Sequence, residues 1–181
     1  MKNKFLGNFE VSSGALRVTD PCYDMDARGA GTLENVVNGI WDAHIDEDVN
    51  RSFVLYICLS SNSNSTLNID ELANFDVDVD SGQAGFYDLE YFKNNHGGEY
   101  DDLNSFYGQC CSVTYSPDDK EQIAGVHSFG VTSSSGFGDG SYRCFVERNE
   151  NEQIIAAKIV FVSYDEEYDE EYDEEYDEEY D

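Results

Sequence analysis

Apolar and polar residues alternate in segment 41–46, and this pattern constrains the fold more than any other. Trp41, Ala43 and Ile45 are apolar, whereas the residues that alternate with them carry a carboxylate or an imidazole. A period of two is typical of a strand with one buried face. The next segment, Arg51–Leu59, is largely apolar, β-branched and aromatic, which indicates a central strand. The sequence therefore predicts a sheet around residues 41–59.

Glycine clusters predict further strands in the rest of the chain. There are fifteen glycines and two prolines, and most glycines lie between apolar runs. Such clusters mark turns between strands. Further strands are expected at four places: Gly14–Thr19, Gly125–Thr132, Ser141–Arg148 and Gln153–Val162. The last two flank Asn149–Glu152, a segment suited to a hairpin turn.

Two segments have helical spacing instead. A three-residue period joins Phe86, Leu89 and Phe92. A longer i, i+3, i+4, i+7, i+8 pattern joins Leu103, Phe106, Tyr107, Cys110 and Cys111. Asp101–Asp102 would place acids in the first turn of this second helix, where the helix dipole favours them. The expected fold is α+β, with six to eight mostly antiparallel strands in a sheet or partly open barrel and one or two helices.

Charge divides the chain into two parts. It carries 39 acidic and 10 basic residues, a formal net charge of −29. The last eighteen residues repeat Tyr-Asp-Glu-Glu and hold thirteen of the acids, so residues 1–163 keep 26 acids against 10 bases, a net charge of −16. A block of acids this dense repels itself and cannot form a core. We expect one globular domain at 1–163 and a disordered acidic tail at 164–181.

The same charge excludes several partners. Duplex DNA and anionic membranes both require clustered Lys and Arg, so we expect neither to bind. Partners are expected to be basic, cationic or metallic. The N-terminus has no apolar run after its lysines, so no signal peptide is predicted, and the five cysteines include no C-x-x-C pair. Free thiols and a cytoplasmic localisation are the resulting predictions.

Four segments are rich in Asp in a way that packing alone does not require. In one of them, Asp76–Asp80, alternate carboxylates would share one face of a strand. The other three combine Asp with Gly or Ser. They read VSSGALRVTDPCYD at 11–24, VDSGQAGFYD at 79–88 and SSSGFGDGSYRCFV at 133–146. These strings resemble the hallmark segments of a family of unknown function from bacteria and their phages. The resemblance spans about residues 11–162 and implies a compact β-rich domain, often in a phage or prophage setting. It does not imply a mechanism.

Four aspartates in these segments are candidate metal ligands: Asp20, Asp80, Asp88 and Asp139. Carboxylate oxygens suit Mg²⁺ or Ca²⁺, and neighbouring glycines let the backbone approach an ion. With a metal, Asp20, Asp80 and Asp139 would be the catalytic candidates of a phosphoester or RNA hydrolase, and a calcium-binding module is a further alternative. The competing interpretation is that Asp-Pro and Gly-Asp-Gly form turns whose side chains cap local N–H groups. No EF-hand pattern is present, and no motif requires a cofactor.

Nucleophilic catalysis has less support. The chain has no G-x-S-x-G elbow, no P-loop and no G-x-G-x-x-G after a strand. The three histidines are expected on the surface or in turns: His44 on the outward face of a strand, His96 in a Gly-rich loop and His127 on a later strand. Without a diagnostic catalytic motif, the sequence favours a binding protein over an enzyme.

The acidic surface is the feature most directly related to function. Regularly spaced carboxylates imitate a phosphate backbone and can occupy a basic nucleic-acid channel, and the tyrosines of the tail add rings that stack on Arg. The sequence therefore predicts a small phage- or prophage-type inhibitor, of the anti-CRISPR or anti-restriction kind. Its target would be a basic host protein such as a guide-RNA nuclease or another nucleic-acid enzyme. A purely solubilising surface is the alternative. The expected contact residues are Asp76, Asp78, Asp101, Asp102, Glu166, Glu167, Glu170, Glu171, Glu174 and Glu175.

Overall fold

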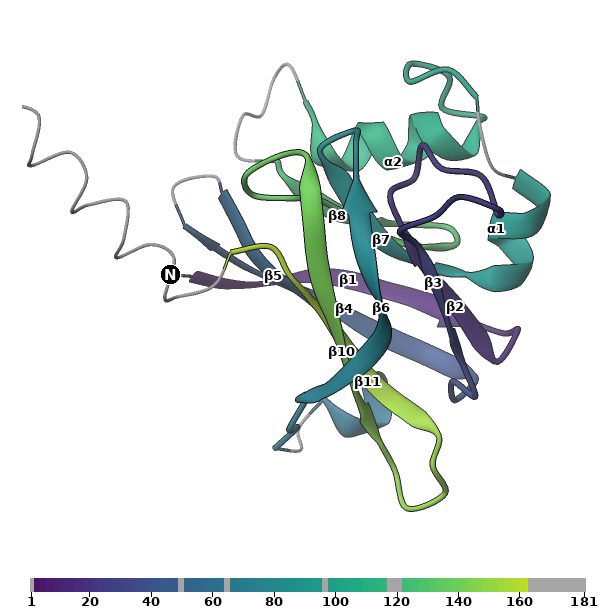
Figure 1. The fold of residues 1–181 in the computed structure, drawn as a ribbon, viewed down its shortest axis with the longest axis vertical. Helices are drawn as coiled ribbons and strands as arrows, with labels where there is room; N and C mark the ends of the chain where they lie inside the picture. Colours follow the sequence, from purple (N-terminus) through teal and green to yellow (C-terminus); the bar gives the residue numbers. More distant parts are fainter. Residues whose placement is uncertain (1, 49–50, 64–65, 96–97, 117–121, 163–181) are drawn as a thin grey trace, which may run out of the picture.

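Two antiparallel sheets that face each other make up most of the molecule (Figure 1). The structure, a computed structural model, describes residues 2–48, 51–63, 66–95, 98–116 and 122–162. The six-stranded sheet has the strand order β1-β4-β5-β11-β10-β6. The five-stranded sheet has the order β3-β2-β7-β9-β8.

The bounds of the elements follow the turn signals of the sequence. The six-stranded sheet consists of β1 (Lys2–Val11), β4 (Gly39–Asp48), β5 (Arg51–Leu59), β6 (Glu71–Val79), β10 (Gly140–Arg148) and β11 (Ile154–Val160). The five-stranded sheet consists of β2 (Ala15–Thr19), β3 (Gly31–Glu34), β7 (Gln83–Asp88), β8 (Ala124–His127) and β9 (Gly130–Ser134). The helices are α1 (Leu89–Asn95), α2 (Phe106–Thr114) and a short 3-10 helix, η1 (Ser60–Asn62). β5 lies inside its sheet, between β4 and β11, as its apolar sequence predicts.

Inward-facing side chains of both sheets form one hydrophobic core. On β4, Trp41, Ala43 and Ile45 are fully buried, which confirms the predicted alternation. On β6, Val77 and Val79 are buried in the same way, and the aspartates between them face the other side. The two sheets touch through β1 and β8 at one edge and through β6 and β3 at the other. No pairing of described strands closes the two sheets into a barrel. The predicted α+β fold of mostly antiparallel sheet with two helices is confirmed.

Both helices pack on the five-stranded sheet (Figure 1). α2 contacts β8 and β9, whereas α1 contacts β2 and β7. A second cluster of buried side chains forms there, made of Tyr87, Phe92, Phe106, Cys110 and Phe129. Neither helix makes a comparable set of contacts with the six-stranded sheet, so the outer face of that sheet is not covered by a described helix.

The helical predictions need two corrections. Phe86 belongs to β7, and the first helix begins after it, at Leu89. The second helix begins after Ser105, whose hydroxyl oxygen accepts a hydrogen bond from a backbone N–H of the first turn. Asp101–Asp102 and Leu103 therefore precede this helix and do not lie in it. A side-chain cap sets the boundary, and the charge pattern does not reveal it.

The strand predictions need a correction as well. Gly125–Thr132 is not one strand, because it contributes to both β8 and β9, which pair with His127 opposite Gly130. Phe129 occupies the turn between them and is buried in the aromatic cluster, so packing places an apolar residue in a turn. The described residues form eleven strands, more than the six to eight expected, because edge strands such as β1 contain no long apolar run. The predicted tail at 164–181 lies outside the described residues.

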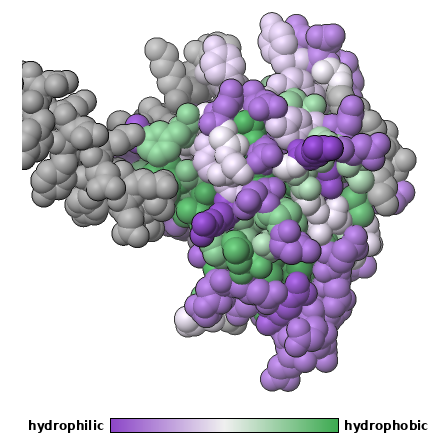
Figure 2. Space-filling view, viewed as in Figure 1, coloured by the Kyte–Doolittle hydropathy of each residue, from purple (hydrophilic) through white to green (hydrophobic). Residues whose placement is uncertain are grey.

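The described surface is largely hydrophilic. Figure 2 shows hydrophilic side chains over the hairpin that joins β10 and β11, with apolar side chains gathered near the middle of the same face. Large exposed apolar residues are scattered over several elements: Phe5, Ile40, Leu72, Tyr91, Tyr100, Leu103, Tyr115 and Phe137. Scattered residues of this kind are normal on a protein surface and do not define a docking patch. Within the described ranges, no helix has the length and apolar character needed to cross a membrane.

Candidate functional site

Asp20 follows β2 and is completely buried, although it carries a carboxylate. One oxygen accepts hydrogen bonds from the N–H of Cys22 (2.8 Å) and the hydroxyl of Ser81 (2.6 Å). The other accepts from the N–H groups of Asp80 (2.9 Å) and Ser81 (2.7 Å). These bonds fill the four acceptor positions of a carboxylate. Asp20 therefore ties the end of β2 to the turn after β6, and in this arrangement it offers a cation no free lone pair.

Asp88, the last residue of β7, is equally buried and makes similar contacts. Its Oδ2 atom accepts hydrogen bonds from the N–H groups of Ser12 (2.7 Å) and Ser13 (3.0 Å). Its Oδ1 atom accepts from the N–H of Glu90 (3.0 Å), in the first turn of α1, where a carboxylate is favourable. Asp88 thus connects the turn between β1 and β2 to the start of α1.

Asp80 and Asp139 are exposed at the same end of the six-stranded sheet. β6 and β10 pair with Val79 opposite Gly140, so the residues just beyond this pair, Asp80 and Asp139, are neighbours at the strand ends. Asp80 also accepts a hydrogen bond from the hydroxyl of Tyr23 (2.7 Å). Together with the contact between Asp20 and the backbone of Asp80, this gathers three of the four candidate aspartates at one end of the molecule.

Asp88 is not part of this group. In the pairing of β2 with β7, Thr19 lies opposite Gly85 and Leu16 lies opposite Asp88, so Asp20 and Asp88 are at opposite ends of that pairing. In the described part of the chain, no three of the four carboxylates bring oxygens within 4.8 Å of one another. Local capping of the predicted kind describes one bond of each buried carboxylate, from the N–H of Cys22 to Asp20 and from the N–H of Glu90 to Asp88. The other bonds come from distant segments of the chain. The Mg²⁺ or Ca²⁺ site and the catalytic role remain predictions without geometric support.

The acids expected to contact a partner are distributed over two elements. Asp76 is exposed on β6, whereas Asp78 is half-buried under the loop at Gly29, whose carbonyl accepts a hydrogen bond from the Asp78 N–H (2.7 Å). Asp101 and Asp102 are exposed in the turn that leads to α2. The remaining expected contact residues lie outside the described residues: Glu166, Glu167, Glu170, Glu171, Glu174 and Glu175.

His127 is half-buried at the end of β8, with its ring against those of Tyr87 and Phe129, so the expected surface position is correct only in part. Its ring lies 4.4 Å from the ring of Phe129 and stacks on Tyr87, and its Nε2 atom lies 2.9 Å from the Thr132 hydroxyl and 3.7 Å from the Cys110 sulfur. Desolvation lowers the pKa of His127 to about 3 and raises the pKa of Cys110 to about 12. Both groups are therefore neutral at pH 7, which is the opposite of an activated thiolate–imidazolium pair.

The predicted positions of the other two histidines differ in how far the structure describes them. His44 lies on the outward face of β4, as the alternation predicts, and the apolar residues on either side of it are buried. His96 lies outside the described residues. All five cysteines are free, in agreement with the predicted thiols.

A hollow of about 620 Å³ on the outer side of β10 and β11 was not predicted from the sequence. Arg143 and Lys158 line it together with Phe137 and Phe145. The Lys158 Nζ atom lies 5.2 Å from the ring centre of Phe145, and the Arg51 guanidinium lies 4.7 Å from that of Phe137. Phe145 lies opposite Lys158 in the β10–β11 pairing. The register of this hairpin would therefore have placed the two side chains together and indicated the hollow.

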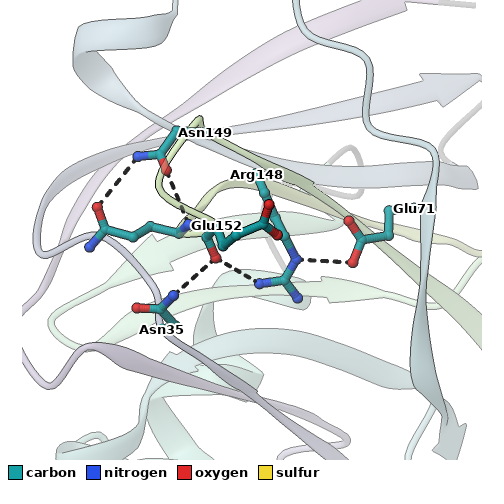
Figure 3. A network of polar contacts seen from close by, with 6 residues as sticks. Asn35, Glu71, Arg148, Asn149 and Glu152 are labelled. Carbon is teal, nitrogen blue, oxygen red and sulfur yellow. Dashed lines mark hydrogen bonds and ion pairs between the residues drawn. The ribbon is translucent and has the colours of Figure 1, made fainter.

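A second hollow, of about 460 Å³, lies where β3, β6 and β10 meet. Here Arg148 donates one hydrogen bond to Glu71 (2.9 Å) and another to the carbonyl of Glu152 (3.0 Å) (Figure 3). The same carbonyl accepts a bond from the side chain of Asn35 (2.9 Å). This network joins β6, the β10–β11 turn and the segment before β4, and so has a structural role.

Sequence comparison assigns most of the folded region to one family. The sequence model of DUF4241, a protein family of unknown function, matches residues 44–159, which is more than half of the chain. The match runs from β4 to β11 and includes the motif segments 79–88 and 133–146. No curated protein and no solved structure matches the chain. The chain therefore belongs to the DUF4241 family of proteins of unknown function.

Proposed function

We propose that this protein is a small phage-type inhibitor that places its acidic surface in the cationic nucleic-acid channel of a host protein. The observation that carries the proposal is the uncompensated charge of the folded surface. Residues 1–163 carry a net charge of −16. The structure shows one ion pair between described side chains, Arg148 with Glu71. A negative potential of this size attracts cationic partners over long distances.

Exposed acids within β6 and just outside the paired ends of β6 and β10 supply a defined contact region, which we call the acidic edge: Asp76, which lies opposite Arg143 in the β6–β10 pairing, Asp80 and Asp139. All three are exposed, and β6 is an edge strand of its sheet. Asp76 and Asp78 are alternate residues of β6, about 6.6 Å apart, and Asp80 follows the end of the strand, so these carboxylates form a short row in which Asp78 is half-buried. A row of this kind is complementary to the Lys and Arg side chains that line a nucleic-acid channel.

The hydrolase alternative lacks such support, because Asp20 already uses all its acceptor positions within the protein. The two functions differ in stoichiometry. An inhibitor that imitates phosphates must be present in at least equal amount to its target, whereas an enzyme acts at a small fraction of that amount. Titration of the target therefore separates the two functions in one experiment.

The test uses the full chain with purified guide-RNA nucleases and restriction enzymes at low and high salt. We expect stoichiometric inhibition at low salt that weakens steeply as salt rises, because the contacts are charged. Neutralising the acidic edge (Asp76→Asn, Asp80→Asn, Asp139→Asn) should lower the affinity at least tenfold. The matched control neutralises three exposed acids elsewhere, so that the net charge is the same: Glu34→Gln, Glu150→Gln and Glu152→Gln.

Two results would contradict the proposal. One is the lack of a complex with any tested nuclease at low salt. The other is inhibition that stays the same after removal of residues 164–181 and neutralisation of the acidic edge. Inhibition at substoichiometric amounts would instead favour the hydrolase.

A further inference from the structure

Three side chains with different donor atoms meet on the outer face of the six-stranded sheet. They are Asp42 and His44 of β4 and Cys58 of β5. One carboxylate oxygen, one imidazole nitrogen and the thiol sulfur all lie within 4.8 Å of one another. Of the described residues, these alone bring three such ligand atoms so close together. The site is separate from the acidic edge and from the motif aspartates.

The backbone of β4 and β5 fixes these three positions. Asp42 and His44 are alternate residues of one strand and therefore share a face. Cys58 lies directly opposite Asp42 in the β4–β5 pairing. The intervening Ala43 and the preceding Trp41 are fully buried and anchor the strand in the core. The three donors are thus presented by a rigid part of the sheet.

Neighbouring side chains orient the carboxylate of Asp42. Its Oδ1 atom accepts hydrogen bonds from the side-chain amide of Asn8 and from the hydroxyl of Ser60. The Oδ2 atom accepts no hydrogen bond that the structure shows from a described residue. Bonds of this kind, from groups outside the ligand set, fix the orientation of metal-binding carboxylates in proteins.

The imidazole of His44 is held in place but is not satisfied. It stacks on the ring of Tyr56 with 4.8 Å between ring centres and an angle of 2°, and Phe5 lies 5.2 Å away on a tilted plane. Its Nδ1 atom is buried and has no hydrogen-bond partner among the described residues.

One carboxylate oxygen, one imidazole nitrogen and one thiolate are a donor set that suits Zn²⁺. Tetrahedral Zn²⁺ places its ligand atoms about 3.4–3.8 Å apart. Side-chain rotations that move the donor atoms by about 1 Å would therefore bring the three donors to these separations. Lys158, on the strand after β5 in the sheet, directs its ammonium over Phe145 of β10, on the side away from β5. Its positive charge is therefore held away from the three donors.

We propose that Asp42, His44 and Cys58 bind one Zn²⁺ ion, with a fourth coordination position open to water. Binding transfers the thiol proton of Cys58 to solvent, and no other covalent change is needed. Because the thiol must lose its proton to bind the ion, the affinity for Zn²⁺ should increase with pH. Three protein ligands with one open position are the arrangement that binds an exchangeable water or anion.

The experiment uses the reduced full chain, stripped of metals, and Co²⁺ as a spectroscopic substitute for Zn²⁺. We expect one equivalent of Co²⁺ to produce a thiolate-to-cobalt charge-transfer band in the near ultraviolet, and Zn²⁺ to remove it. Zn²⁺ alone should also raise the thermal unfolding midpoint, because it binds the folded state. The acidic tail can hold divalent ions, but it contains no thiol and cannot give this band.

Variants assign the ligands. Cys58→Ala should abolish the band, and His44→Gln and Asp42→Asn should each weaken Co²⁺ binding by about tenfold or more. Asp46→Asn is the matched control, because Asp46 is the next outward residue of β4 and bonds to Asn3 instead. It should leave the affinity within about twofold, as expected for a charge outside the ligand set.

Three outcomes would overturn the proposal. The first is that Co²⁺ gives no thiolate band, and the second is that several Co²⁺ ions bind weakly and give no such band. The third is a band that survives Cys58→Ala. A band lost in Cys111→Ala would assign the ion to another thiol and would also overturn it. Because Cys58 is buried, its replacement can disturb folding. In that case the test depends on the variants of the two outward residues, His44→Gln and Asp42→Asn. If both leave the affinity for Co²⁺ unchanged, the proposed site is refuted.

Discussion

Among the described residues, a cysteine meets a histidine in two neighbourhoods, and the surroundings of the two differ. Cys110 and His127 lie between α2 and the five-stranded sheet, against the rings of Tyr87 and Phe129. Cys58 and His44 lie on the outer face of the six-stranded sheet, next to a carboxylate. The enclosed pair is surrounded by rings and hydroxyls, so it stays neutral and serves packing. The pair on the outer face, the open pair, has no described helix over it and has a carboxylate neighbour, although Cys58 is buried and His44, like His127, is half-buried.

The aspartates show the same contrast. Asp20 is enclosed and its carboxylate is fully used by backbone and side-chain donors, whereas Asp80 is exposed and accepts one recorded bond from Tyr23. A residue type therefore does not determine a role in this protein. The role of a residue depends on its degree of enclosure and on the identity of the neighbouring donors. Each of these can be tested by substitution.

The largest effect is expected from the aromatic cluster around the enclosed pair. Phe106 is 2% exposed and packs against the rings of Tyr87, Phe92 and Phe129. Phe106→Ala should lower the free energy of unfolding by about 3–5 kcal/mol, because it removes buried surface and leaves a cavity. Chemical denaturation followed by circular dichroism measures this change.

The matched control removes the same atoms next to the open pair. Phe5 is 54% exposed and lies beside His44, so Phe5→Ala should lower the free energy of unfolding by less than about 1 kcal/mol. Equal losses in the two variants would show that the two neighbourhoods do not differ in enclosure.

A smaller loss is expected at the enclosed carboxylate. Asp20→Asn replaces one acceptor oxygen by an NH₂ group that faces N–H donors, and it should destabilise the fold by about 2–4 kcal/mol. Asp80→Asn keeps an acceptor for Tyr23 at an exposed position and should change stability by less than about 1 kcal/mol. Denaturant midpoints of the two variants give the comparison, and similar midpoints would remove the structural role assigned to Asp20.

Local sequence patterns predicted the elements whose signals lie within a few residues. The alternation of Trp41, Ala43 and Ile45 predicted β4 and its buried face, and the hairpin at Asn149–Glu152 follows from turn residues between apolar runs. The start of α2 was misplaced because the hydroxyl of Ser105 caps the helix. A cap depends on one hydrogen bond, which a charge pattern does not encode.

The candidate site depends on contacts that no local pattern contains. Three of the four hydrogen bonds to Asp20 come from Asp80 and Ser81, about sixty positions later in the chain, and only the bond from Cys22 is local. The pairing of Asp42 with Cys58 requires the β4–β5 register, although the outward direction of His44 follows from alternation alone. Single-sequence patterns give the direction of a side chain on its strand, but its neighbours depend on how distant strands pair.

A pH-dependent effect should separate the two histidines. His127, with its pKa near 3, stays neutral in the folded state, whereas in the unfolded chain it binds a proton near pH 6.5. Below pH 6.5 the unfolded state therefore holds more protons, and stability falls as pH decreases towards 3, by about 1.4 kcal/mol per pH unit at most. This contribution is fully present above pH 6.5 and lost below pH 3.

The measurement compares unfolding free energies at pH 7 and pH 5 for the wild type, His127→Gln and His44→Gln. Relief of carboxylate repulsion at low pH acts on all three proteins, so the difference from wild type isolates each histidine. His127→Gln should remove the larger part of the acid-induced loss. His44 should contribute less, because the charges of Asp42 and Asp46 oppose the lowering of its pKa, whereas desolvation alone acts on His127. A larger effect from His44 would reverse the assignment of enclosed and open pairs.

The smallest effect is expected at the most open polar contact, the ion pair of Arg148 with Glu71. Their side chains are 30% and 52% exposed, so solvent screens the pair. Glu71→Gln should change the free energy of unfolding by less than about 0.5 kcal/mol, because loss of the pair is offset by relief of repulsion in an acidic protein. Arg148→Gln should be the more destabilising of the two, since it adds to the net negative charge and leaves the carbonyl of Glu152 without one donor. Denaturation at low and high salt tests this order, and the difference between the variants should shrink as salt screens the charges. If Glu71→Gln were instead as destabilising as Asp20→Asn, exposure would not govern the contribution of carboxylates in this fold, and the contrast between enclosed and open sites would lose its physical basis.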